Sequence, residues 1–290
     1  KTLNTNLIFD DNKLELESIK TNISLKSFFS KEFSIDDLNV STRAIKLNDI
    51  VKLIRSFENS IELFILDKVI KEGFLVGDIN INFDSNGNIK DDFKIKGFVK
   101  NAKLEISKNY NLKNLNLLFN IKKNEFILKD IDTKFNEIKL ILPSVVVKEK
   151  KSVFHVKGKI LSKEKSIDNN LLNNLFRDNI KKLPIDNINF KSSSNFAFNI
   201  NKKFKISEFD LKSKINLNNL DYKNDLLKIE NYLPTFKKFI RLKDHKISIN
   251  YNKNQFDISG KGKVLIGDKL DSLNYKIKKK IINIFLIQIL

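Results

Sequence analysis

The sequence contains no cysteine and no methionine in 290 residues. The absence of cysteine excludes disulfide bonds and thiolate chemistry, and it is compatible with any compartment. No apolar run approaches the roughly 20 residues that a membrane-spanning helix needs, and the tail 281–290 is too short. The chain begins at Lys1 without a charged and then apolar signal peptide. We therefore expect a segment of a longer protein, or else a processed chain, with a tail that is a truncated strand or the start of a further element.

Motifs for catalysis and metal binding are also missing. The two histidines, His155 and His245, lie far apart in alternating segments, so each is expected at the surface or in a lining rather than as a ligand. No His-Glu-x-x-His, Gly-x-Ser-x-Gly or phosphate-binding loop is present. The segment 84–88 resembles a calcium loop, but its glycine comes too early and no closing glutamate follows. We expect no enzymatic activity, no catalytic residues, no metal and no cofactor.

The positive charge comes almost entirely from lysine. The formal net charge is +19, and arginine occurs only at positions 43, 55, 177 and 241. The lysines are scattered singly between apolar residues, whereas proteins that read phosphates usually cluster basic residues and favour arginine. This pattern is typical of a solvated strand face, so nucleic acid is not expected as a partner. A basic nucleic-acid-binding β domain stays as an alternative, and weak attraction to anionic headgroups is compatible with the charge.

The clearest pattern in the chain is the strict alternation between residues 72 and 130. Ile79, Ile81 and Phe83 share one parity, and polar residues occupy the positions between them. Asn86-Gly87 then tolerates the positive φ angles of a tight hairpin turn, so a turn is predicted there. Similar alternating runs continue through the second half of the chain. The sequence predicts a mostly β fold whose strands have one apolar face and one face rich in Lys, Asn and Asp.

This stretch resembles the AsmA-like family, the bacterial bridge-like lipid transfer proteins. The resemblance covers about residues 40–160 and is weaker afterwards. It rests on Gly73, Phe83, Asp84, Asn86, Gly87, Gly97, Val99, Asn101, Ala102 and Leu104. The resemblance implies phospholipid transfer between membranes of a Gram-negative bacterium, in outer-membrane biogenesis. It also implies a location in the periplasm or cell envelope and an inner-membrane anchor outside this chain.

Two or three helices are expected beside the strands. Apolar residues at three- and four-residue steps predict a helix over about 48–71, with Asn48 as N-cap and Gly73 as its stop. Acidic residues in this helix favour a plug at the end of the sheet over a helix on an anionic membrane. A second helix is predicted over about 167–182, ending before Pro184.

The second helix marks the one predicted boundary in the chain. It separates a β-groove segment over residues 1–165 from a continuing β-groove segment over residues 166–290. The two segments can also form one continuous domain. Residues 224–242 are irregular around Pro234 and are interpreted as a short helical cap.

The apolar strand faces must be covered, because soluble proteins do not tolerate large exposed apolar patches. Roughly sixteen to eighteen strands are too many for a small barrel, and an open sheet of this size usually curls. The prediction is an elongated, curled antiparallel sheet that forms an apolar groove for acyl chains. The alternative is a structural β-sandwich or solenoid of an adhesin or surface protein, with a dry core. The expected lipid-groove lining is Ile79, Ile81, Phe83, Phe93, Ile95, Val99, Leu117, Phe119, Phe126, Leu128, Ile138, Leu140, Phe196, Phe198, Ile249 and Phe256.

Overall fold

The computed structural model of the chain describes residues 1–9, 12–23, 33, 35–57, 60–107, 110–169, 185–201, 205–223, 239–252, 255–266 and 269–280. Within these residues, fifteen strands belong to one sheet and two helices accompany it. The helices are α1 (Leu47–Phe57) and α2 (Ile61–Val69). The strands are β1 (Thr2–Phe9), β2 (Asn12–Ile23), β3 (Ile35–Thr42), β4 (Ile45–Lys46), β5 (Ile70–Asn82), β6 (Lys94–Ser107), β7 (Tyr110–Lys122), β8 (Glu125–Phe135), β9 (Ile138–Lys150), β10 (Val153–Asp168), β11 (Ile185–Asn201), β12 (Ile206–Lys223), β13 (Phe239–Asn252), β14 (Gln255–Ile266) and β15 (Lys269–Lys280).

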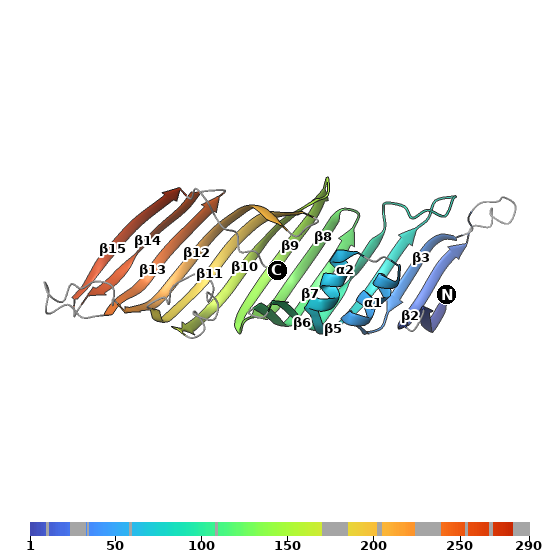
Figure 1. Cartoon of the computed structure of the whole chain (residues 1–290), viewed down its shortest axis with the longest axis horizontal. Coiled ribbons are helices and arrows are strands. Elements are labelled where there is room, and N and C mark those ends of the chain that lie inside the picture. Colours follow the sequence, from blue (N-terminus) through green and yellow to red (C-terminus); the bar gives the residue numbers. More distant parts are fainter. Residues whose placement is uncertain are drawn as a thin grey trace.

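The strands follow one another in space in nearly the same order as in the sequence. The path runs from β1 to β15, every pairing is antiparallel, and only the short β4 lies off the path, beside β5. Figure 1 shows the resulting elongated sheet, in which β1 and β15 are the two edges of the described part. The prediction of a mostly β fold built on one elongated antiparallel sheet is therefore confirmed.

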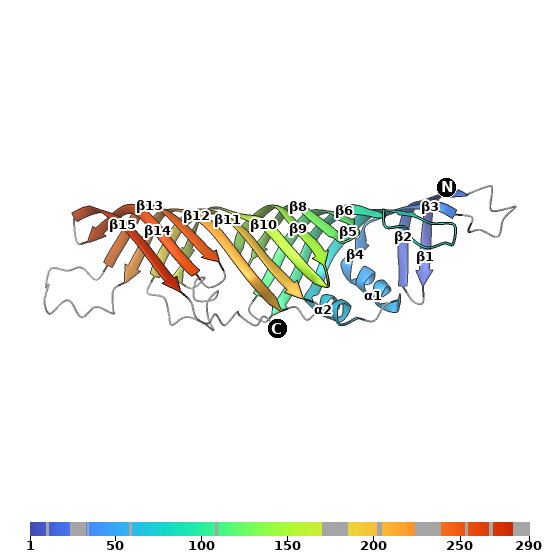
Figure 2. The ribbon, with the colours of Figure 1, turned by 90° about the horizontal axis from the view of Figure 1, so that it is seen from above.

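The sheet is curled about its long axis. In Figure 2 the two halves of the central strands lean toward the same side, and α1 and α2 lie on that side near the N-terminal end. Leu47 of α1 packs against a cluster formed by Ala102, Leu115, Ile131 and Val145, which identifies the strand face that these helices meet. We call this face the concave face and the opposite one the convex face.

Irregular backbone in the strands accompanies the curl. The β5–β6 and β6–β7 registers shift around Gly73 and Ala102, and such bulges bend a strand and increase its twist. Gly73 has a φ of +129°, and a Cβ placed there would come within 2.8 Å of both Ala102 and Leu47. A side chain at this position would therefore separate α1 from the sheet, which explains the glycine.

The first predicted helix is interrupted. Ser60 is the N-cap of α2, because its side chain accepts a hydrogen bond from the Leu63 amide. The prediction of Asn48 as N-cap is wrong, since α1 begins at Leu47. The prediction of Gly73 as a helix stop is wrong too, because α2 ends at Val69 and Gly73 lies inside β5. The prediction of one helix over 48–71 did not allow for Ser60 as the N-cap of a second helix.

Other expected boundaries shift as well. Residues 167 and 168 end β10 instead of starting a helix, Asn169 is helical, and residues 170–182 of the predicted helix lie outside the described part. The expected boundary at 165/166 falls within β10, which pairs with both β9 and β11. Residues 239–242 begin β13 and are not a helical cap, while residues 224–238 lie outside the described part.

The turn at Asn86-Gly87 is present. Gly87 has a φ of +82°, and its amide donates to the Asp84 carbonyl. It belongs to the connection between β5 and β6, residues 83–93, in which Phe83 and Ile89 form an antiparallel bridge. We call this connection the excursion after β5. The strand β15 was not predicted, because its apolar residues are few and lysines fill both parities near its end.

Candidate ligand-binding face

A continuous row of residues crosses ten strands on the concave face. Each member is the cross-strand partner of the next, so their side chains share one face. From β5 to β14 this central row consists of Gly77, Gly97, Phe119, Leu128, Val145, Gly158, Phe196, Leu211, Tyr251 and Phe256. Polar side chains are absent from it except for the Tyr251 hydroxyl.

A second row lies beside the central row, two residues along each strand. From β5 to β11 it consists of Ile79, Ile95, Ile121, Phe126, Val147, Val156 and Phe198. Aromatic rings connect the rows near β11 to β13. The Phe196 and Phe198 centroids are 5.9 Å apart, Phe198 and Phe209 are 6.3 Å apart, and Phe209 and Tyr251 are 5.7 Å apart. The two rows form a broad apolar strip along the sheet.

The predicted lining residues are only partly covered. Of the sixteen, Phe119 is buried, with 8% of its surface exposed, and the others are half-buried. The protein exposes 19,869 Å² of surface, whereas a compact monomer of 33.8 kDa would expose about 12,800 Å². Helices α1 and α2 cover the concave face near one end, and no other described helix covers the rest. Apart from Gly77, Phe119 and Val145, the residues of the two rows therefore keep part of their surface accessible.

Most of the predicted lining residues meet on this face, and two do not. Ile79, Ile95 and their neighbours pair directly across strands, and Leu140 and Ile138 pair with Thr133 and Phe135. Phe83 instead belongs to the excursion after β5, where its ring lies 5.4 Å from the Phe33 ring. Phe93 precedes β6 and lies outside the strands. Placing Phe93 on the return strand was wrong by one residue.

Polar residues also share the concave face, and Ser194 and Ser213 were not predicted there. Ser194 and Ser213 are cross-strand partners with hydroxyl oxygens 2.7 Å apart, and Ser213 is buried. Ser194 has the same parity as Phe196 and Phe198, so the alternation already placed it there. His245 is 1% exposed, opposite Leu217, and its Nε2 lies 2.9 Å from the Lys263 carbonyl oxygen. Its Nδ1 has no hydrogen-bond partner among the described residues.

The convex face is mostly polar and charged, apart from an apolar row of Val76, Phe98 and Leu118 across β5 to β7. Exposed ion pairs connect neighbouring strands there, including Lys96 with Asp78 at 3.8 Å and Lys148 with Glu125 at 2.8 Å. The hydrogen bond from Lys148 lowers the pKa of Glu125 below its usual range. His155 lies on this face, as it alternates with Phe154 and Val156 in β10.

Two other kinds of site are absent from the described residues. No cluster of three or more His, Asp or Glu residues could hold a metal ion within that part of the chain. Neither described helix has the length and apolar composition that crossing a membrane requires. No protein-family model, curated protein or solved structure matches this chain. The functional argument therefore rests on the surfaces of the molecule itself.

Proposed function

We propose that this chain is a segment of an AsmA-like envelope protein that shields the acyl chains of phospholipids along its concave face. The accessible apolar strip from β5 to β14 carries this proposal. Exposed apolar surface of this extent is unfavourable in water unless a ligand or partner covers it. Lipid tails fit such a strip, because they need apolar contact and no specific polar partner.

The same strip provides for movement as well as binding. Burial of each CH₂ group contributes roughly 0.8 kcal/mol, so an acyl chain gains several kcal/mol on the strip. Neighbouring positions in the two rows offer similar apolar contacts, so a chain can shift along the sheet with little change in free energy. The nine steps between the ten strands from β5 to β14, at about 4.8 Å each, give a strip about 43 Å long. The lipid headgroups would stay in solvent, outside the concave face.

The cellular setting belongs to the same proposal. A periplasmic location, an inner-membrane anchor outside this chain and a place in outer-membrane biogenesis follow from the resemblance to the AsmA-like family. Fractionation of cells that make the natural full-length protein tests the location. Recovery in the cytoplasmic fraction would contradict this part of the proposal and leave the lipid-binding part standing.

Mass spectrometry of lipids that copurify with the chain tests the function. We expect phospholipid in the wild type and a marked loss in Ile95→Asp, since Ile95 is a half-buried member of the second row. A carboxylate among acyl chains costs several kcal/mol unless it is protonated or reaches water. Asn120→Asp is the matched control, because Asn120 is the partner of Lys96 on the convex face and the change adds the same charge.

The outcomes separate the alternatives. Folded Ile95→Asp protein with a normal lipid content would refute the lipid-shielding function. A wild type without lipid, together with an Ile95→Asp variant that unfolds, would favour a structural β-sandwich or solenoid with a dry core. Circular dichroism melting of all three proteins distinguishes a loss of lipid from a loss of fold.

A further inference from the structure

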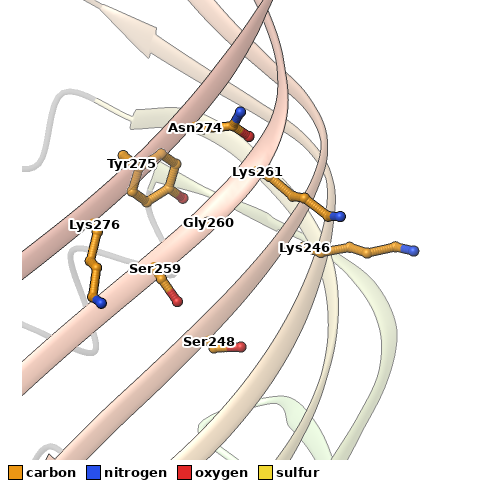
Figure 3. A pocket seen from close by; sticks show the side chains of 8 residues that line it. All are labelled: Lys246, Ser248, Ser259, Gly260, Lys261, Asn274, Tyr275 and Lys276. Carbon is orange, nitrogen blue, oxygen red and sulfur yellow. The ribbon is translucent and has the colours of Figure 1, made fainter.

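The convex face of β13, β14 and β15 contains a shallow, solvent-open depression of about 530 Å³. The side chains of its lysines and serines lie on the convex face, because these residues alternate with His245, Ile247 and Gly262 along the strands. Gly260 and its cross-strand partner Tyr275 border the depression from positions of concave parity. The depression is lined by Lys246, Ser248, Ser259, Gly260, Lys261, Asn274, Tyr275 and Lys276. Figure 3 shows Lys246 and Lys261 extending in the same direction, away from the Tyr275 ring.

Two rows of the sheet ladder bring these groups together. Lys246 pairs with Lys261, which pairs with Asn274. Ser248 pairs with Ser259, which pairs with Lys276. The two rows are two residues apart on the same face, so three ammonium groups, two hydroxyls and one amide border one patch. All of these groups can donate hydrogen bonds, and the lining contains no carboxylate.

The lysine pair is unfavourable in the chain alone. Like charges directly opposite each other in a sheet are destabilising, and a second pair, Lys243 and Lys263, follows on the same two strands. No described carboxylate lies within 4.0 Å of the Lys246, Lys261 or Lys276 ammonium groups. Elsewhere on the convex face, by contrast, lysines such as Lys96 and Lys148 have acidic partners. An anion from outside the chain would supply the missing partner.

We propose that this patch binds the phosphate groups of an anionic membrane surface. The depression is shallow, so one free phosphate would remain hydrated and screened by salt, whereas many headgroups at once can meet several lysines. Nucleic-acid binding is less well supported, because the lining has no arginine and its one aromatic ring points away from the lysines. The inference does not depend on the lipid-shielding function, since it concerns the opposite face.

Flotation with vesicles tests the proposal on the full chain. The vesicles contain phosphatidylcholine alone or phosphatidylcholine with phosphatidylglycerol, at about 0.1 M and about 1 M NaCl. We expect salt-sensitive binding to the anionic vesicles only. The triple variant Lys246→Gln, Lys261→Gln and Lys276→Gln should bind about tenfold or more weakly. Its content of copurifying phospholipid should not change, which separates this test from that of the concave face.

A second depression on the convex face provides the matched control. It lies at the other end of the sheet and is also lined by three lysines, Lys20, Lys94 and Lys96, but it includes Asp78, 3.8 Å from Lys96. The triple variant Lys20→Gln, Lys94→Gln and Lys96→Gln loses the same net charge. It should bind anionic vesicles within about twofold of the wild type, because its lysines are partly neutralised.

Four results would overturn the proposal. The first is no binding to anionic vesicles, and the second is an equal loss in both triple variants, which would mean attraction to net charge alone. The third is saturation by inorganic phosphate at low millimolar concentration in calorimetry, which would indicate a small-anion site. The fourth is tighter binding of an oligonucleotide than of vesicles at the same salt concentration, with loss in the first triple variant, which would indicate a nucleic-acid surface.

Discussion

The Phe119 ring of β7 lies across Gly97 of β6, its cross-strand partner on the concave face. A Cβ placed on Gly97 would come within 2.7 Å of the Phe119 Cζ atom. The same arrangement recurs at Gly158, where Phe196 of the next strand takes the space of the missing side chain. An aromatic side chain that covers a strand glycine fixes the register of the two strands. These pairs therefore locate the phenylalanines of the central row.

Gly97→Ala should destabilise the sheet. The new methyl group would displace the Phe119 ring or the β5 backbone, and such overpacking costs about 1–3 kcal/mol. Gly77→Ala is the control, because Gly77 pairs with Gly97 but its Cβ would meet no atom closer than 3.4 Å. Its stability should stay the same or rise by up to about 1 kcal/mol. Urea unfolding of both variants measures the difference, and equal stabilities would contradict the close approach.

Alternation was sufficient to predict most of the strands and their faces, although it did not predict β15. Ile79, Ile81 and Ile95 lie on one face because a period of two leaves no other choice once one face is apolar. Bulges, however, follow from tertiary contacts. Gly73 has the spacing of a helix stop in the sequence, and only the approach of Ala102 and Leu47 explains why it lies in a strand. Local propensity contains no information about such a neighbour.

The candidate site was predictable in its apolar part and not in its polar part. The parity of Phe196 and Phe198 placed them on the concave face. The same parity placed Ser194 there, but the prediction named only apolar residues. The lysine patch depends on which lysines become neighbours across β13, β14 and β15. Lysines scattered along the sequence become clustered only when the registers of three strands are known. The interpretation of the charge as a solvated face rested on the scarcity of arginine and on spacing along the chain, and neither shows which lysines become neighbours.

Ser60→Ala should loosen α2 without unfolding the sheet. The Ser60 hydroxyl accepts a hydrogen bond of 3.3 Å from the Leu63 amide, and loss of such a cap costs about 1 kcal/mol. Hydrogen exchange of the Leu63 amide should become about fivefold faster, because that is the factor that corresponds to this cost. Ser60→Asp is the control and should keep slow exchange, since aspartate is an equally good N-cap. Unchanged exchange in Ser60→Ala would show that tertiary contacts alone hold the start of α2.

The Asp84 carboxylate should stabilise the excursion after β5 in a pH-dependent way. A hydrogen bond from the Asn88 side chain, followed by backbone amides including that of Asn88, lowers the pKa of Asp84 below its ordinary value of 3.8. The folded pKa lies below the unfolded one. The contribution is therefore fully present above the unfolded pKa and is lost as the pH falls through the folded pKa.

Two measurements check the Asp84 prediction. The NMR titration midpoint of the Asp84 carboxyl should rise in Asn88→Ala, because the largest cause of the lowered pKa is removed. The difference in stability between the wild type and Asp84→Asn should shrink on acidification from neutral pH to below the ordinary pKa of 3.8. A midpoint that is the same with and without the Asn88 side chain would refute this account of the turn.

Lys261→Glu should stabilise the chain while it weakens vesicle binding. The substitution replaces a like-charge pair with an opposite-charge pair across β13 and β14, and cross-strand pairs of this kind contribute about 0.2–1 kcal/mol. The melting temperature should rise from wild type to Lys261→Gln to Lys261→Glu at low ionic strength. The three values should converge at about 1 M NaCl, where exposed charges are screened. Binding to anionic vesicles should fall in the same order. A wild type that melts higher than Lys261→Glu would mean that the lysine pair is not strained, and the need for an external anion would disappear with it.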